Sequence, residues 1–213
     1  MTDLDFFFDP VCPWAWITSR WVAEVQELRD YKVSWKFISL KILNQDKMDY
    51  ASMPAGYKEV HAAGTSGLRV AAKARSVAGN DAVAKVYTAL GTSLHNRQER
   101  ELFVADIEGH IAGLLSQAGL PTEWAAAVND ETFDRLIADE TALALDRAGK
   151  EVGTPIITFN PGGLKEASFF GPVISTIPRG EEATKLWDAI ETIATASGMA
   201  ELKRSLRARP SFD

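Results

Sequence analysis

Two short β-rich regions lie far apart in this chain, and a long helical region separates them. In the first, residues 5–8 form an apolar run that ends at Asp9 and Pro10, and residues 33–37 alternate between apolar and polar side chains. Both patterns predict strands. Between them, residues 13–28 place apolar side chains at steps of three and four after an initial proline. This spacing predicts a helix, so the first region is expected to form a β-α-β unit.

The second β-rich region begins after residue 153. Residues 156–159 and 168–171 predict two strands joined by a turn at residues 160–163. A last helix is expected to begin near Glu181 and Glu182, because acidic side chains are favoured in the first turn of a helix. The second region therefore predicts a β-β-α unit.

Neither β-rich region has enough strands to stand alone, so we expect the two to complete one sheet. The chain then divides into an α/β domain formed by residues 1–42 and 153–213, and an all-α-helical insertion at residues 43–152. Within the insertion, helices are expected at about residues 57–63, 68–78, 81–96, 101–118, 123–128 and 130–148.

Two details of the insertion carry specific expectations. Asp130 is expected to be the N-cap of the insertion's last helix. The run of Gly64, Thr65, Ser66 and Gly67 contains two glycines but lacks the lysine that a phosphate-binding loop requires at the matching position. We therefore expect a turn there and no phosphate site.

The charge and cysteine counts exclude several classes of protein. Twenty-nine acidic and 23 basic residues give a net charge of −6 and a pI near 5.2, which leaves no broad basic field for nucleic acid or an anionic membrane. The acidic N-terminus differs from a secretory signal, and no stretch is apolar over the length of a bilayer, so a cytoplasmic location is expected. The expected partner is a small molecule, and whether the chain forms a homodimer stays open.

The only cysteine of the chain, Cys12, lies where the first strand leads into the first helix. Pro13 follows it and suits the first position of a helix. Unpaired backbone N–H groups at a helix N-terminus stabilise a thiolate, so we expect the pKa of Cys12 to be lowered and its sulfur to be nucleophilic. A single cysteine cannot form a disulfide within the chain.

The segment Cys12-Pro13-Trp14-Ala15 resembles the CPWC active site of DsbA-like oxidoreductases with a thioredoxin fold. A second resemblance lies far along the chain, where residues 152–155 match the cis-proline loop of that family. Further matching segments are residues 9–10, 16–21, 94–96, 169–173 and 177–183. Over nearly the whole chain, the sequence is most similar to the actinobacterial mycothiol-dependent reductases and nitroreductases, which are related to the 2-hydroxychromene-2-carboxylate isomerases.

This resemblance implies a thioredoxin-like fold and a set of roles. Cys12 corresponds to the attacking thiol, followed by Pro13, and Pro155 to the cis-proline that faces it. Thr154 would offer its backbone to an extended thiol ligand, and Trp14 would lie beside that ligand. Mycothiol or another low-molecular-weight thiol would be the co-substrate, with no tightly bound cofactor, flavin or metal.

The resemblance also implies that Asn44, Tyr57 and His95 line the cleft between the helical insertion and the sheet. The other two histidines, His61 and His110, lie in helical stretches without partners at the spacing of metal ligands. For these two we expect surface or capping roles.

Ala15 departs from the family pattern, because the second, resolving cysteine of the motif is absent. A ligand bound to Cys12 as a mixed disulfide must then be released by a thiol from outside the chain. Two origins for Ala15 stay open: a natural monothiol enzyme, or an engineered replacement of cysteine that traps a mixed disulfide and impairs turnover.

The sequence thus favours a thiol-disulfide oxidoreductase that reduces disulfides or electrophilic and nitroaromatic compounds. The first alternative is a thiol-dependent isomerase, or an enzyme similar to the kappa glutathione transferases, which needs no second cysteine. The second alternative is a binding module that keeps the fold without catalysis, for which an ordinary pKa of Cys12 would be expected.

Overall fold

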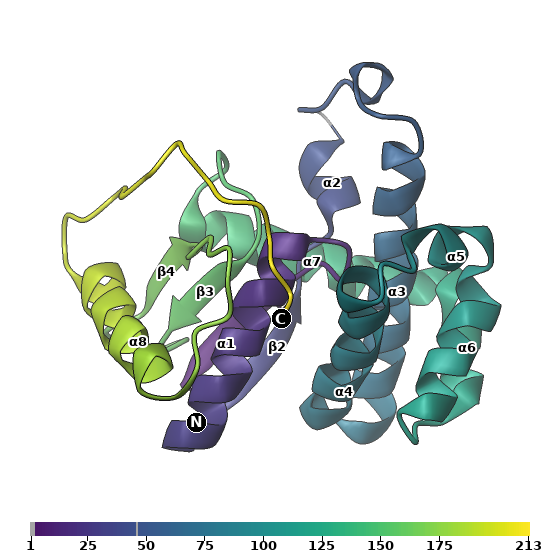
Figure 1. Ribbon diagram of the computed structural model, residues 1–213, viewed down its shortest axis with the longest axis horizontal. Helices are drawn as coiled ribbons and strands as arrows, with labels where there is room; N and C mark the ends of the chain where they lie inside the picture. The colour runs from purple at the N-terminus through teal and green to yellow at the C-terminus, as the bar shows by residue number, and fades with distance from the viewer. Residues whose placement is uncertain (1–2, 46) are drawn as a thin grey trace.

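The computed structural model describes residues 3–45 and 47–213, with one four-stranded sheet at its centre (Figure 1). The strands are β1 (Leu4–Phe8), β2 (Val33–Phe37), β3 (Ile156–Phe159) and β4 (Ala167–Phe170). Their order is β2-β1-β3-β4, in which β1 and β2 are parallel while the pairs β1–β3 and β3–β4 are antiparallel. The two β-rich regions therefore complete one sheet, as predicted.

Three helices cover the two faces of this sheet. They are α1 (Pro13–Arg29), α7 (Asp134–Ala148) and α8 (Gly180–Thr195). Successive side chains of a strand point to opposite faces. Accordingly, Phe6 and Phe8 share a core with Trp21 of α1 and Trp187 of α8, whereas Phe7 packs in a second core with residues of α7. Every residue of β1 is buried because both faces of this central strand are covered.

The helices between β2 and α7 form the other half of the molecule (Figure 1). They are α2 (Leu40–Asn44), η1 (Tyr50–Ser52), α3 (Tyr57–Ala78), α4 (Asn80–Gly91), η2 (Thr92–Asn96), α5 (Arg100–Ala105), α6 (Ile107–Gln117), η3 (Thr122–Asn129) and η4 (Glu131–Phe133). Of these, η2 is a single turn of π-helix. No helix in the described ranges is both long and apolar enough to cross a membrane.

The turn expected at Gly64–Gly67 is wrong, because α3 continues through it without a break. A Cβ added to Gly64 would lie 2.7 Å from Oδ1 of Asp9, and one added to Gly67 would lie 3.2 Å from Cγ of Pro10. The two glycines therefore allow α3 to approach the loop that follows β1. Sequence alone does not distinguish a glycine of this kind from one that ends a helix.

The helix expected at residues 101–118 is divided at Asp106, whose carboxylate caps α6 by accepting a hydrogen bond from the Gly109 N–H at 2.9 Å. The N-cap expected at Asp130 is also displaced. Its carboxylate accepts from the Thr132 N–H at 3.0 Å and caps the short 3-10 helix η4, and α7 begins only afterwards.

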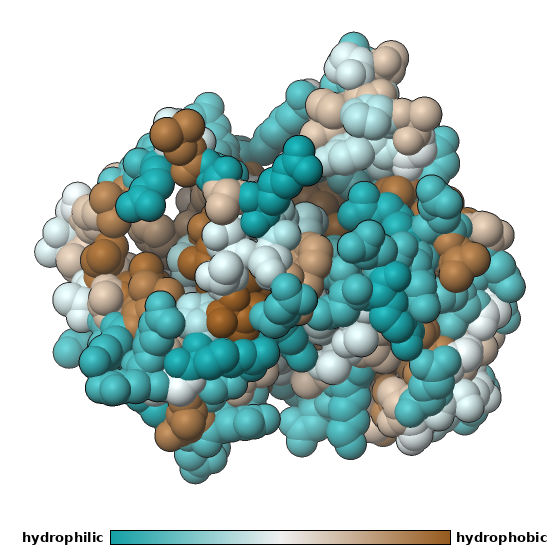
Figure 2. Space-filling model, viewed as in Figure 1, coloured by the Kyte–Doolittle hydropathy of each residue, from teal (hydrophilic) through white to brown (hydrophobic). Residues whose placement is uncertain are grey.

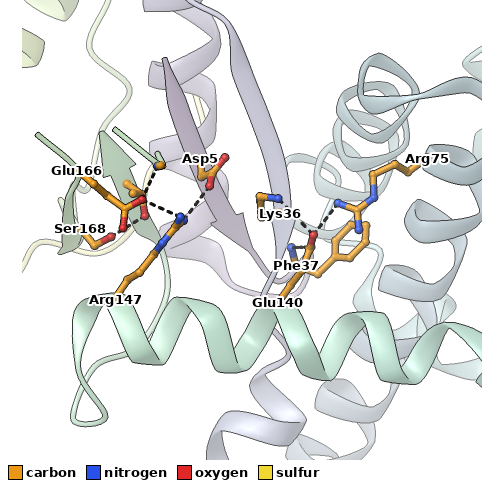
Figure 3. A network of polar contacts seen from close by, with 10 residues as sticks. Asp5, Lys36, Phe37, Arg75, Glu140, Arg147, Glu166 and Ser168 are labelled. Carbon is orange, nitrogen blue, oxygen red and sulfur yellow. Dashed lines mark hydrogen bonds and ion pairs between the residues drawn. The ribbon is translucent and has the colours of Figure 1, made fainter. Parts of the chain in front are cut away.

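Polar side chains tie α7 to the sheet and to α3 (Figure 3). The buried Glu140 accepts hydrogen bonds from the Phe37 N–H at 2.8 Å and from the Arg75 guanidinium at 2.9 Å. Further along α7, Arg147 forms an ion pair with Asp5 of β1 at 2.8 Å. The last helix of the expected insertion thus packs directly on the sheet, and the division at residues 42 and 153 stays a prediction.

An aromatic cluster joins the helical half to the sheet. The ring of Tyr87 on α4 stacks on Phe8 with 3.8 Å between centroids, and its edges meet Trp16 and Trp35 at 5.5 and 5.9 Å. Aromatic pairs at such separations contribute beyond the area that they bury. Sheet, α1 and α4 therefore share one core.

Replacement of Gly91 by alanine should destabilise this junction, because a Cβ at this position would overlap the indole of Trp16. We expect a loss of about 1–3 kcal/mol in the free energy of unfolding, the usual cost of overpacking. Gly113→Ala is the matched control, since a Cβ there meets nothing within 4 Å. Urea unfolding followed by tryptophan fluorescence measures both, and equal stability of the two variants would contradict this account.

Candidate active site

Cys12 is the N-cap of α1, and Pro13 occupies the first turn, as the sequence predicts. Its backbone is extended, with φ −82° and ψ 113°, so the side chain folds over the end of the helix. The Ala15 N–H donates to Sγ at 3.4 Å. A sulfur in this place receives one of the hydrogen bonds that the first turn cannot make internally.

The loop before β3 brings a second group to the same sulfur. Sγ of Cys12 donates to the carbonyl oxygen of Thr154 at 3.5 Å, although 142 positions separate the two residues. The Thr154–Pro155 peptide bond is cis, and Thr154 Oγ1 donates to the Phe7 carbonyl at 3.3 Å. The structure therefore brings together the two motifs on which the resemblance rests.

The expected lowering of the Cys12 pKa is wrong for this arrangement. Only 5% of Cys12 is exposed, and this burial raises its pKa from 9.0 to about 12. The N–H groups of Ala15 and Trp14 act in the opposite direction, and the nearby carboxyl of Asp9 adds to the rise. Loss of water around the thiolate outweighs the helix N-terminus, so the thiol is protonated at neutral pH.

Asp9 is a buried residue of this site to which sequence reasoning assigned no role. Its carboxyl is fully buried, and its two oxygens accept hydrogen bonds from the Val11 N–H at 3.0 Å and the Leu40 N–H at 2.8 Å. Burial raises the pKa of Asp9 to about 7. The carboxyl thus fixes the loop that carries Cys12 to the start of α2. The pairing of Asp9 with Pro10 before the motif was the available signal.

His95 lies against the active-site loop. The π-helix η2 follows α4 and directs the buried imidazole to the Pro10 carbonyl, to which Nε2 donates at 2.9 Å. The ring stacks on Trp16 with 6.0 Å between centroids. Burial lowers the pKa of His95 to about 4, so the ring is neutral at pH 7. The next residue, Asn96, accepts a hydrogen bond from Nε1 of Trp16 at 3.0 Å.

The remaining predicted ligand residues are less closely tied to the sulfur. Trp14 is half-buried on the first turn of α1, and Asn44 and Tyr57 are half-buried at the end of α2 and the start of α3. In the described part of the chain, neither Asn44 nor Tyr57 forms a hydrogen bond to Cys12 or Thr154. Their roles, and that of Trp14, stay predictions.

The surface role expected for His61 is wrong. This residue is 3% exposed, its Nδ1 lies 2.9 Å from the Tyr50 hydroxyl, and its ring packs on Tyr57 with 4.6 Å between centroids. His110 is half-buried, with Nε2 2.8 Å from the Ser93 hydroxyl. Among the residues described, no three His, Cys, Asp or Glu side chains are grouped as a metal site would require.

A family model decides which proteins this chain is related to. The model described as Rv2466c-like, mycothiol-dependent nitroreductase Rv2466c, matches residues 11–204. The chain belongs to this Rv2466c-like family. It is also 28% identical to the uncharacterized protein Rv2286c of Mycobacterium tuberculosis over 206 residues, which are 96% of this chain and 82% of that protein.

Solved structures agree on the fold. The cytosolic disulfide reductase DsbM from Pseudomonas aeruginosa is similar with a TM-score of 0.57 at 16% identity, over 88% of this chain and 98% of that chain. The same protein with GSH gives a TM-score of 0.52 at 17% identity, over 75% and 86%. The fold is thus the DsbA-like thioredoxin fold, as expected, and the family places the chain among the thiol-dependent oxidoreductases.

Alkylation of Cys12 should be slow at neutral pH, because its pKa of about 12 leaves little thiolate. We expect the rate constant with iodoacetamide to rise with pH beyond pH 9 instead of reaching a plateau below pH 8. Asp9→Asn should increase the rate at pH 8, since the charge that raises the thiol pKa is removed. A plateau below pH 8 in the native protein would contradict the burial argument.

Proposed function

We propose that the chain is a monothiol oxidoreductase in which the sulfur of Cys12 forms a mixed disulfide with its substrate and a low-molecular-weight thiol releases it. One observation carries this proposal: Sγ lies between the Ala15 N–H in the first turn of α1 and the Thr154 carbonyl before β3. An N–H group stabilises the thiolate that attacks. The Thr154 carbonyl accepts from the protonated thiol, and it can accept from a bound thiol ligand once Cys12 has lost that proton.

The first step is attack of the Cys12 thiolate on a disulfide. The new S–S bond joins Sγ to one half of the substrate, while the other half leaves as a thiolate and takes up a proton. The buried thiol must lose its own proton before this step. Since burial is the main cause of its raised pKa, contact of Sγ with water or a polar substrate would lower that pKa, and the Ala15 N–H would then support the anion.

The second step requires a thiol from outside, because Ala15 stands where a resolving cysteine would attack. The thiolate of mycothiol attacks the mixed disulfide, Sγ leaves as a thiolate, and a mycothiol mixed disulfide is released. The net reaction converts one disulfide and one thiol into one thiol and one disulfide. For a nitroaromatic substrate, two thiols become a disulfide as the nitro group is reduced to nitroso and water is formed.

The resemblance to the family supports a proposal for how the thiol is held. The Thr154 backbone would pair with the extended part of the ligand next to Pro155, and Trp14 would cover it. Asn44 and Tyr57 would contact the polar remainder of the thiol, and His95 would contact the second substrate. A cytoplasmic location suits a site that depends on a free thiol.

Mycothiol disulfide should form an adduct on Cys12. Intact-protein mass spectrometry after incubation with mycothiol disulfide, and separately with glutathione disulfide, measures the adduct and shows which thiol fits. Cys12→Ser should form none, because its hydroxyl cannot exchange with a disulfide. If neither disulfide forms an adduct under conditions in which iodoacetamide labels Cys12, the proposal is contradicted.

Ala15→Cys should accelerate multi-turnover reduction of a small disulfide. Ala15 lies one helical turn after Cys12 and its N–H already contacts Sγ, so a thiol there is placed to attack a mixed disulfide from within the chain. Ala15→Ser is the control of similar size without a thiol. An unchanged rate would favour the thiol-dependent isomerase, the alternative that fits a chain with one cysteine.

A further inference from the structure

The chain after α8 is held to the molecule mainly by its last residues. Residues 196–213 form neither helix nor strand, and Figure 1 shows them running from α8 back across the molecule to α1. Residues 196–209 are exposed throughout, including Leu206 at 86%, whereas Pro210, Ser211 and Phe212 are half-buried. In the same view, hydrophobic surface patches gather on the half that carries α8 and this segment (Figure 2).

Three contacts hold this end. The Ser211 N–H donates to the Ser175 carbonyl at 2.8 Å, and the side-chain amide of Asn96 donates to the Phe212 carbonyl at 2.6 Å. The Phe212 ring packs on His95 with 5.5 Å between centroids and a tilt of 37°. A flat aromatic group and an acceptor oxygen are thus bound side by side by two consecutive residues of η2.

The same two residues form the layer next to the reactive cysteine. His95 donates to the carbonyl of Pro10, two residues before Cys12, and its ring stacks on Trp16. The amide oxygen of Asn96 accepts a hydrogen bond from Nε1 of Trp16, and this bond directs the NH₂ group of Asn96 to the Phe212 carbonyl. These interactions fix both side chains independently of the chain end, so the surface they present is preformed.

The two surface residues lie inside the range that the family model matches. The Rv2466c-like model covers residues 11–204, so His95 and Asn96 lie within the match, whereas Ser211 and Phe212 lie beyond it.

We propose that Phe212 is an intramolecular competitor at the site formed by His95 and Asn96: its ring and its carbonyl oxygen occupy the places that the aromatic ring and an acceptor oxygen of the substrate would take. The imidazole face receives the aromatic ring, and the Asn96 amide donates to the oxygen. This inference deepens the proposed function, on which it rests, by naming the segment that must leave before an aromatic substrate binds.

Removal of residues 210–213, and separately Phe212→Ala, should strengthen binding of the probe 4-nitrobenzoate. Isothermal titration calorimetry without any thiol measures its Kd. We expect about a tenfold decrease on removal of residues 210–213, which takes away both the ring contact and the hydrogen bond to the Phe212 carbonyl. Phe212→Ala removes only the ring, so its Kd should decrease less. Leu206→Ala, on the same segment but exposed, should leave the Kd unchanged, and thermal unfolding verifies that each variant is folded. Cyclohexanecarboxylate, which lacks the aromatic ring, should bind no better to any variant.

A free peptide with the sequence of residues 209–213 should bind to the truncated protein and displace 4-nitrobenzoate, and its Phe→Ala form should do neither. An equal Kd for the probe in the full and truncated chains would overturn the proposal, because the segment would not compete. Weaker binding after truncation would also overturn it, because Phe212 would then be part of the site. Neither result depends on thiol chemistry, so failure here is distinct from failure of Cys12 to form an adduct.

Discussion

The antiparallel pairing of β1 with β3 is the constraint on which the site depends. Phe7 near the end of β1 pairs with Ile156 at the start of β3, so the loop leaving one strand lies beside the loop entering the other. Cys12 follows the first loop and Thr154 lies in the second, which places Sγ 3.5 Å from the Thr154 carbonyl. A parallel pairing of the same strands would put these loops at opposite ends of the sheet.

Burial controls the chemistry of the sulfur that this pairing positions. A rise in the Cys12 pKa from 9.0 to about 12 corresponds to roughly 4 kcal/mol against the thiolate. A helix N-terminus typically supplies about 0.3–2 kcal/mol in its favour. The arrangement described is therefore that of a resting thiol, with its proton directed to Thr154. Reaction needs a change that brings water or a polar ligand to Sγ, whereas the N–H of Ala15 is already in place.

The sequence was sufficient for the sheet, because apolar periodicity predicts its strands. The contact between Cys12 and the loop at Pro155 was expected only from the resemblance of two motifs to the DsbA-like family. The sequence was not sufficient where packing between distant segments decides. The glycines of α3 looked like a turn because their close approach to Asp9 depends on the tertiary fold. The pKa of Cys12 differs from the expectation for the same reason, since a helix N-terminus is visible in sequence and the degree of burial is not. No pattern near residue 212 signalled a contact with His95.

The shared core limits how the site can open. A hinge motion of the helical half would separate Tyr87 on α4 from Phe8, Trp16 and Trp35, which are all at most 2% exposed. Exposing a large apolar side chain costs about 1.5–3 kcal/mol, so exposing four would cost about 6–12 kcal/mol, close to the whole stability of an ordinary domain. Opening is therefore expected in segments outside this core. Residues 49–56, mostly exposed before α3, and the segment after α8 are attached by few buried contacts, so their displacement leaves the aromatic cluster intact.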